Sequence, residues 1–404
     1  MSLQPSYTEP SSPEHPAESS AAGLPGARIG VLGVGGGGGN AVAHMMASSL
    51  EGVRYLAANT DVQALQNVGG AYRLALGETL TGGLGAGSNP NVGHEAAQES
   101  LPEIRKFLDG LDMLFLTAGM GGGTGTGASP VIAEAARSMG ILTVAVVTRP
   151  FLMIEGPKRA NYAEQGIQAL KEHTDSLIII SNDLLVPELG KNATLLKAFS
   201  AVNDVLYNAV AGIARMITSP GLINIDFADV KAVMAAQGNA KVGTGVGTGE
   251  MRARDAALQA INSPLLEYRY VEGALTVMVN IAGGEDVGLG EFNEIGEIVQ
   301  AIAADDATII VGTSIDHSLL DGAIKVTVVA AGLPDAPPHA ASSVTRERAQ
   351  ESVAPARGAA GGMNPGQMVG GTASSSASAP APATSHSDAD YLDIPAFLRR
   401  PTKR

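Results

Sequence analysis

Residues 119–127 read Gly-Met-Gly-Gly-Gly-Thr-Gly-Thr-Gly and stand between an apolar run, Met113–Thr117, and a helical pattern, Pro130–Met139. The apolar run predicts a buried strand, so the glycines fall at a strand-to-helix junction. Glycines at such a junction can form a concave nest of backbone N–H groups, and the hydroxyls of Thr124 and Thr126 can add bonds to phosphate or to the water of a metal ion. No Gly-Lys-Ser/Thr follows, which excludes a P-loop. We interpret the segment as a phosphate-binding loop.

A second glycine-rich segment precedes it, Gly33-x-Gly35-x-x-Gly38 within the run Gly35–Gly39. It follows a predicted strand, Ile29–Val34, and opens a predicted helix, Asn40–Ser49. This context suits phosphate, and it also suits the dinucleotide loop of a Rossmann fold, for which Asp61 would supply the acid that contacts ribose. A Rossmann fold needs no second phosphate-binding loop such as residues 119–127. The two loops together therefore favour a nucleotide-binding protein of another class.

The pattern along the chain predicts an α/β fold with a parallel sheet covered on both faces. A long helix, Ala201–Thr218, follows with an apolar stripe at i, i+3 and i+4 spacing. A smaller α/β domain is expected beyond it, and Gly243–Gly249 is interpreted as one of its turns. The further strands expected are Arg54–Asn59, Thr143–Thr148, Leu177–Ser181, Leu275–Ile281, Thr308–Ile315 and Ile324–Ala330, with a helix at Asn293–Ala303.

Composition limits the class of protein. The 404 residues hold no cysteine, which excludes disulfides, thiolate metal sites and a cysteine nucleophile. No apolar run reaches the roughly 18 residues of a membrane span, and the amino terminus lacks the apolar region of a signal peptide, so we expect a cytoplasmic protein. The formal charge of −14, with no basic stripe, makes broad nucleic-acid binding an unfavoured function.

Composition also divides the chain. We expect a disordered extension at 1–27, a nucleotide-binding domain at 28–200, the long helix at 201–220 and a second domain at 221–333. Residues 334–387 are rich in Ala, Pro, Ser and Gly, which predicts a disordered linker. Apolar residues return in 388–404, which is typical of a peptide that folds on a partner.

These segments resemble the tubulin/FtsZ family of cell-division GTPases. Gly121–Gly127 (GGGTGTG) matches the tubulin signature. Other motifs stand in family order, namely Gly35–Asn40, Asn59-Thr60-Asp61, Gly83–Pro90 (GLGAGSNP), Asn182-Asp183, Gly221–Lys231 (GLINIDFADVK) and Asp390–Arg399. The resemblance implies a tubulin-like GTP-binding domain, a core helix and a carboxy-terminal domain. It further implies a GTPase that polymerises head to tail into protofilaments of the division ring at midcell.

The resemblance also implies roles for particular residues in binding GTP or GDP, with Mg²⁺ accompanying the phosphates and no metal site of the protein's own. Glu155 and Arg159 would reach the ribose and phosphates, or they form an ordinary i,i+4 ion pair. Phe199 could stack on a purine, although the sequence alone favours a core residue. The phosphates would be held by Gly36, Gly37, Gly38, Gly39, Asn40, Gly123, Thr124, Gly125 and Thr126, with Gly85–Asn89 flanking the γ-phosphate and Asn182 and Asn203 contacting sugar and guanine.

Asp226 and Asp229 have two interpretations. Locally, Asp226 is a helix N-cap with Asp229 three residues later. The resemblance implies that this loop enters the nucleotide site of the next subunit, where both acids polarise the attacking water and Asn224 helps to position it. The segment Phe151–Glu155 is one residue longer than the usual family form.

For the tail, the resemblance implies that Asp390–Arg399 binds the membrane tethers FtsA and ZipA. Two other functions remain open from the residues themselves. One is an NAD-dependent oxidoreductase that uses Gly33–Gly38 and Asp61, and the other is a filament protein that binds nucleotide without hydrolysing it.

Overall fold

The computed structural model describes residues 26–333 except 49, 191–192, 220–222, 224, 236–237, 264–275, 302, 304–306, 317–318 and 320–321. The described residues belong to one compact unit, Met1–Pro338. The predictions for the amino-terminal extension, the linker and the terminal peptide concern residues 1–25 and 334–404, which lie outside the described residues.

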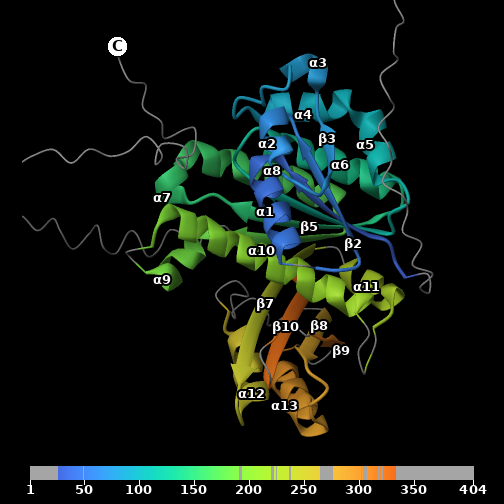
Figure 1. The fold of residues 1–404 in the computed structure, drawn as a ribbon, viewed down its shortest axis with the longest axis vertical. Helices are drawn as coiled ribbons and strands as arrows, with labels where there is room; N and C mark the ends of the chain where they lie inside the picture. The colour runs from blue at the N-terminus through green and yellow to red at the C-terminus, as the bar shows by residue number, and fades with distance from the viewer. Residues whose placement is uncertain are drawn as a thin grey trace, which may run out of the picture. The chain divides into compact units, whose positions relative to one another are not determined.

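One ten-stranded sheet runs through this unit in the order β3-β2-β1-β4-β5-β6-β7-β10-β8-β9 (Figure 1). Neighbouring strands from β3 to β7 are parallel, β10 is antiparallel to both β7 and β8, and β8 and β9 are parallel. The strands are β1 Ile29–Val34, β2 Val53–Asn59, β3 Tyr72–Ala75, β4 Met113–Gly119, β5 Leu142–Arg149, β6 Ser176–Ser181, β7 Gly238–Thr248, β8 Thr276–Gly283, β9 Thr308–Ile315 and β10 Ala323–Leu333.

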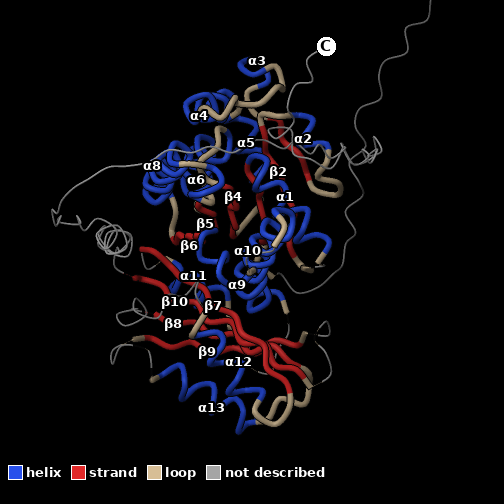
Figure 2. The backbone as a smooth tube through the Cα atoms, turned by 90° about the vertical axis from the view of Figure 1, so that its left-hand side faces the viewer, coloured by secondary structure: helices blue, strands red, loops and turns tan. Residues whose placement is uncertain are grey.

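Helices cover both faces of the sheet, as the sequence predicts. One apolar cluster packs α1 and α10 on one face of β1–β6, and a second packs α4, α5, α6 and α8 on the other face. A third packs α12 and α13 against β8 and β10 (Figure 2). The helices are α1 Gly35–Ala47, α2 Val62–Gln66, α3 Glu78–Thr81, α4 Pro90–Glu99, α5 Leu101–Leu108, α6 Thr124–Ser138, α7 Leu152–Glu155, α8 Pro157–His173, α9 Val186–Leu189, α10 Leu195–Thr218, α11 Phe227–Met234, α12 Arg252–Ile261 and α13 Leu289–Gln300, with a 3-10 turn at Asn182–Leu185.

The order of the strands indicates at which edge of the sheet a ligand binds. The first six strands run 3-2-1-4-5-6, so the chain reverses its direction of winding between β1 and β4. Ligands of open parallel sheets bind outside the carboxyl ends of the strands at this switch point. Both glycine-rich segments follow the strands that flank it.

Both helices at the switch point begin earlier than predicted. α1 begins at Gly35 rather than Asn40, and α6 begins at Thr124 rather than Pro130. Glycine has a poor helix propensity, so the pattern did not extend either helix into its glycines. Tertiary packing stabilises the start of α6 despite this low propensity, because all residues from Thr124 to Ala133 are buried. Gly35–Gly39 therefore belong to the first turns of α1, and Gly125 and Gly127 to the first turn of α6.

The interpretation of residues 243–249 as a turn is wrong. All but the last of these residues belong to strand β7, which pairs with β10 from Asn239 to Thr248. Gly245 and Gly247 let helix α12 approach the strand, since a Cβ at Gly245 would lie 2.6 Å from the Ala260 nitrogen and a Cβ at Gly247 would overlap the Arg252 carbonyl. Close packing is the reason for these glycines.

The sheet continues from one half of the unit to the other. β6 and β7 pair in parallel from Ser176 opposite Gly238 to Ile178 opposite Ala240.

Helix α10 begins at Leu195, six residues before the predicted start, because Thr194 caps it by accepting a bond from the Lys197 amide. Among the described helices, none is long and apolar enough to cross a membrane.

Candidate functional site

The two glycine-rich helix starts touch each other at the switch point. A Cβ at Gly35 would lie 2.9 Å from the Gly125 nitrogen, and a Cβ at Gly37 would lie 3.3 Å from the Gly119 Cα. Gly35 also has a φ of +71°, which side chains other than glycine rarely adopt. Glycine at these positions therefore brings the first turns of α1 and α6 into backbone contact.

The two helix starts favour an anion. The N-cap positions, Val34 and Gly123, give no side-chain capping bond, and neither helix has an acidic residue in its first turn. Backbone N–H groups and the positive ends of two helix dipoles thus face one region. A phosphate group is the ligand that such an arrangement suits best.

The first glycine run divides into exposed and buried positions. Gly36, Gly37 and Asn40 are exposed, and a Cβ at Gly36 would meet nothing within 4 Å. Gly38 and Gly39 are buried, and a Cβ at Gly38 would overlap the Thr117 carbonyl of β4. The exposed positions can face a ligand directly, whereas Gly38 sets the distance between α1 and the sheet and Gly39 packs against the Val68 side chain.

The two threonines of the signature segment have partners within the protein. Thr124 Oγ1 lies 2.6 Å from Thr60 Oγ1, and both side chains are buried. Thr126 Oγ1 accepts a 2.8 Å bond from the Gly121 amide. Both hydroxyls therefore help to set the shape of the loop in addition to any contact with a ligand.

Residues 83–90 pack against the other side of the α6 start. A Cβ at Gly123 would lie 2.8 Å from the Ala86 Cβ and 3.0 Å from the Asn89 nitrogen, and a Cβ at Gly127 would overlap the Pro90 carbonyl. The α6 start thus lies between α1 on one side and residues 83–90 on the other.

Glu155 and Arg159 form an ion pair of 2.7 Å, but they belong to two different helices. α7 ends at Glu155, Gly156 has a φ of +84°, and α8 begins at Pro157. Glu155 also accepts a 3.0 Å bond from the Phe151 amide. The Arg159 carbonyl lies 2.7 Å from the position of a Cβ on Gly121, so this helix junction abuts the signature segment.

The residues proposed for the sugar and base lie on the 3-10 turn that follows β6 and on α10. Asn182 is buried, and its Oδ1 has no hydrogen-bond partner among the described residues. Asn203 is half-buried on α10. The expectation of a core residue at Phe199 is wrong, because its side chain is 38 % exposed and makes an edge-to-face contact with Phe151. An exposed ring one turn from Asn203 remains able to stack.

The paired acids stand at the start of α11. Asp226 caps this helix, since its Oδ1 accepts a 2.7 Å bond from the Asp229 amide, which confirms the local interpretation. Both acids are exposed, and Asn224 lies outside the described residues. The cap fixes the backbone between the two carboxylates while leaving both open to solvent.

The acids lie at the opposite end of the sheet from the glycine-rich helix starts (Figure 1). The end of α10 contacts the amino end of β2, because a Cβ at Gly52 would lie 3.0 Å from the Thr218 Cβ. The glycine-rich segments follow the carboxyl ends of β1 and β4. A six-residue strand separates these edges by about 20 Å. The acids of one chain therefore cannot contact a phosphate bound at its own helix starts.

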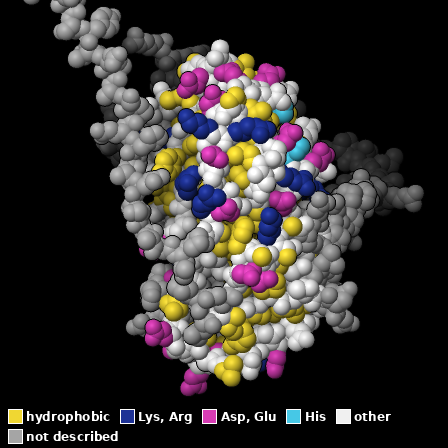
Figure 3. All heavy atoms as spheres, turned by 90° about the vertical axis from the view of Figure 1, so that its right-hand side faces the viewer, with side chains coloured by type: hydrophobic (Ala, Val, Ile, Leu, Met, Phe, Trp, Pro, Cys, Tyr) yellow, Lys and Arg dark blue, Asp and Glu magenta, His cyan; other side chains and the backbone are white. Residues whose placement is uncertain are grey.

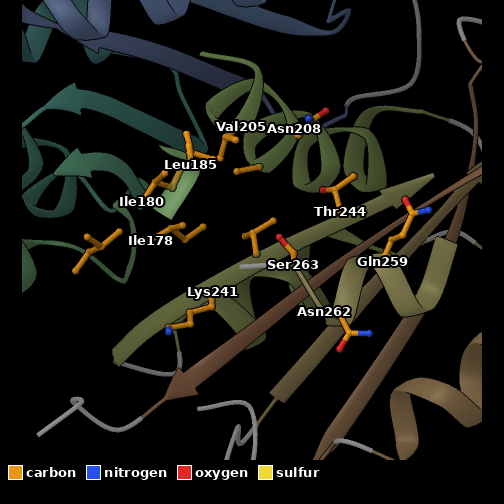
Figure 4. Close-up of a pocket in the computed structure, with 13 residues that line it drawn as sticks. Ile178, Ile180, Leu185, Val205, Asn208, Lys241, Thr244, Gln259, Asn262 and Ser263 are labelled. Carbon is orange, nitrogen blue, oxygen red and sulfur yellow. The ribbon is translucent and has the colours of Figure 1, made fainter. Parts of the chain in front are cut away.

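A cavity of about 430 Å³ lies elsewhere, between β6 and α10 on one side and β7 and α12 on the other (Figure 4). Ile178, Ile180, Leu185 and Val205 form its apolar wall, and Asn208, Thr244 and Gln259 belong to its polar wall. None of the proposed phosphate-binding residues lines it. A smaller cavity of about 160 Å³ adjoins the first segment and is lined by Gly36 and Asn40 among others.

The face drawn in Figure 3 has no continuous cationic stripe, because Lys and Arg side chains (dark blue) are interspersed with Asp and Glu (magenta) among the residues described there. Arg28 and Asp112, for example, form an exposed ion pair of 3.1 Å. Within the described ranges, no three His, Asp or Glu side chains gather closely enough to hold a metal ion.

Sequence reasoning missed two residues that shape the site. Thr60 binds Thr124, although it was noticed only as part of a motif. Asp183 accepts bonds of 3.2 and 3.3 Å from the Leu152 amide and so fixes the start of α7. Neither contact has a signal in spacing, since each joins segments more than 30 residues apart.

Comparisons with known proteins agree with this geometry. A model of the Tubulin/FtsZ family GTPase domain matches residues 28–189, and one of the FtsZ family C-terminal domain matches residues 238–334. The chain is 49 % identical to a cell division protein FtsZ from Coxiella burnetii, covering 93 % of this chain and 96 % of that one. It is 50 % identical to that of Pseudomonas aeruginosa, over 92 % and 96 %.

A solved FtsZ dimer from M. jannaschii shares 44 % identity with a TM-score of 0.71, covering 75 % of this chain and 88 % of that one. Two family models match in the right order, and the relatives are near 50 % identical over almost the whole length. These matches exclude the oxidoreductase alternative. The chain belongs to the tubulin/FtsZ family of cell-division GTPases.

Proposed function

We propose that this GTPase assembles head to tail into protofilaments, and that each GTP is hydrolysed by residues of two neighbouring subunits. The observation that carries the proposal is the separation of the exposed acids from the glycine-rich helix starts. A single chain cannot bring these two groups together. The edge of one subunit that carries Asp226 and Asp229 must therefore meet the edge of the next subunit that carries the glycine-rich helix starts. Such a heterologous contact does not close on itself, and it generates open filaments.

In the first half of the site, backbone amides bind the phosphates of GTP. Gly36, Gly37 and Asn40 are the exposed positions of α1 that would contact them, while Gly38 packs α1 against β4 and Gly39 packs against Val68. Gly123, Thr124, Gly125 and Thr126 provide the second helix start. A Mg²⁺ ion would be held mainly by the phosphates and water, as is usual for this hard cation.

The nucleoside would extend from the phosphates toward α10. Asn203 would contact the guanine and the buried Asn182 the sugar, and the orphaned Oδ1 of Asn182 supports a polar partner there. Arg159 and Glu155 lie beside the signature segment and would contact the ribose and phosphate. The exposed Phe199 ring would stack on the base.

In the second half of the site, Asp226 and Asp229 of the adjacent subunit orient the water that attacks the γ-phosphate, with Asn224 assisting. Phosphoryl transfer depends on positioning and electrostatic stabilisation more than on covalent chemistry by the protein. Two exposed carboxylates on a capped helix start can accept hydrogen bonds from that water.

Residues 390–399 would bind the membrane tethers FtsA and ZipA and so place the filaments in the midcell ring. This part of the proposal rests on the sequence of the peptide and on family membership. Deleting residues 390–404 should abolish binding to the tethers while leaving assembly intact. Loss of assembly in that variant would contradict the assignment.

Phosphate release from GTP, followed against protein concentration, tests the whole proposal. Hydrolysis by paired subunits predicts almost no activity below a threshold concentration and a linear rise above it. Light scattering of the same samples should rise at the same threshold. Turnover proportional to concentration from the lowest values would show that one chain contains the complete site.

A further inference from the structure

Thr60 holds together two parts of the phosphate site that are far apart in the sequence. It follows β2, and its side chain is 1 % exposed. Its hydroxyl lies 2.6 Å from the Thr124 hydroxyl in the first turn of α6. Its carbonyl accepts a 3.1 Å bond from the Gly85 amide and a 3.4 Å bond from the Thr81 hydroxyl. One residue therefore binds both the α6 start and the segment at residues 83–90.

The neighbouring contacts fix residues 83–85 to the same strand end. The Val62 amide donates to the Gly83 carbonyl over 3.1 Å, and Asp61 and Leu84 form an antiparallel bridge. Beyond this anchor, Leu84 is 87 % exposed, and Ser88 has a φ of +59°. Residues 84–88 are thus a loop that is held at its base by residues 60–62, with Leu84, Gly87 and Ser88 exposed and Ala86 buried.

The position of this loop relates it to one end of the phosphate chain. α1 touches the α6 start at Gly125, and residues 86–89 touch it at Gly123 on the other side. If the γ-phosphate lies beside Gly85–Asn89, as the proposed function implies, a chain of phosphates would begin at α1, cross the α6 start and end at this loop. Only the last phosphate of a triphosphate would reach it, so the loop is where a triphosphate and a diphosphate differ.

We propose that Thr60 is a positioning residue that transmits occupation of this loop by the terminal phosphate to Thr124 and the first turn of α6. The backbone bond to Gly85 joins Thr60 to the loop, and the paired hydroxyls join it to the helix. The inference rests on the proposed function, because it assumes that the two helix starts bind a nucleoside triphosphate. It adds a residue that makes the site respond to the number of phosphates.

The test compares T60V with T60S in the full-length chain. Valine keeps the branched shape and the backbone bond but removes the hydroxyl, and serine keeps the hydroxyl. We expect T60V to lower the kcat of GTP hydrolysis about 10-fold above the assembly threshold, with GDP affinity unchanged within about twofold. T60S should restore most of the kcat. Equal losses in GDP affinity and kcat, or a loss as large in T60S, would overturn the inference.

T143V is the matched control. Thr143 is also fully buried, and its hydroxyl also makes one hydrogen bond, to the Ile141 carbonyl 3.0 Å away, which T143V removes. Thr143 lies at the amino end of β5, away from the glycine-rich helix starts. We expect T143V to lower the melting temperature while leaving kcat near that of the wild type. A kcat loss as large as that of T60V would mean that any buried threonine in the sheet has this effect, and would overturn the inference.

A double-mutant cycle with T124V tests the pairing directly. If the hydroxyls act as a unit, T60V/T124V should have nearly the kcat of T124V alone, whereas independent roles predict that the two losses multiply. Should T60V fail to fold, T60A removes the same hydroxyl and is compared with T60S in the same way. A wild-type chain that binds no GTP would refute the proposed function. A wild type that hydrolyses GTP beside an unaffected T60V would refute only this inference.

Discussion

The two segments richest in glycine after residue 100 serve opposite purposes. Residues 119–127 join a strand to a helix, and their glycines bring backbone amides to an open edge of the sheet. Residues 243–248 lie inside β7, and their glycines admit helix α12 to within contact of the strand. Glycine content alone therefore does not mark a binding site. The surrounding pattern does, because a strand followed by a helix leaves amides without partners, whereas a strand paired on its edge does not.

Gly36→Ala should show the largest effect on the binding side of this comparison. A Cβ there meets nothing within 4 Å, so the fold can accept the methyl group, which would then occupy the space of a phosphate. We expect GTP and GDP affinity to fall about 100-fold, or about 2.7 kcal/mol, with an unchanged melting temperature. Equilibrium nucleotide binding and thermal unfolding measure the two quantities.

Gly296→Ala is its control, since this glycine of α13 also has open space around it. It should alter neither nucleotide affinity nor assembly. Wild-type affinity in the Gly36 variant would show that the exposed edge of α1 does not bind the phosphates.

Gly247→Ala should have the converse effect. Its methyl group would overlap the Arg252 carbonyl, so β7 and α12 would have to separate. Overpacking of this kind costs about 1–3 kcal/mol. Denaturant unfolding should report that loss, while GDP affinity stays within about twofold of the wild type. A large loss of affinity with unchanged stability would mean that the second glycine-rich segment is also a nucleotide site.

The smallest effect concerns pH and the ion pairs that join α12 to α13 and to the residues just before it. Hydrogen bonds from the Arg252 side chain hold the pKa of Glu291 and of Asp286 below their ordinary values. Because these pKa values are lower in the folded state, the ion pairs stabilise the fold above about pH 4.5 and lose this contribution as the pH falls further. We expect E291Q to weaken the dependence of stability on pH between about 5 and 3 by less than about 1 kcal/mol.

Urea unfolding of the wild type and E291Q across that pH range checks this expectation. E294Q is the matched control, because Glu294 lies on the same helix and approaches Arg254 only at 3.9 Å. A steeper pH dependence in E291Q than in the wild type would contradict the assigned sign.

Much of the fold could be predicted from the sequence. Strands β1, β2, β4, β5 and β6 were predicted to within two residues, because buried parallel strands give continuous apolar runs. The partly buried edge strand β9 was predicted with the same bounds that the structure gives. β7 was missed because Gly243, Gly245 and Gly247 interrupt any apolar alternation, and their reason lies in α12. The phosphate-binding role of the two glycine-rich segments stays a prediction, whereas the family resemblance was confirmed by the comparisons.

Contacts between distant segments could not be predicted. The Thr60–Thr124 hydroxyl pair depends on how β2 and α6 lie in three dimensions. The break at Gly156 places Glu155 and Arg159 on separate helices, although their spacing in the sequence suits one helix. The roles of Asp226 and Asp229 in hydrolysis stay predictions, since a second subunit is needed to bring them to a phosphate.

Mixing two inactive variants tests the central claim, that neighbouring subunits share one site, most directly. D229A should bind GTP but lack turnover, and its filaments should be more stable. At a GTP concentration between the dissociation constants of the wild type and G36A, G36A should be largely free of nucleotide but keep both acids. In an equal mixture, G36A subunits supply the acids to nucleotide held by D229A, so GTPase activity should reappear at about a quarter of the wild-type rate if the order along the filament is random. Co-sedimentation of both variants without any recovered GTP hydrolysis would contradict the account.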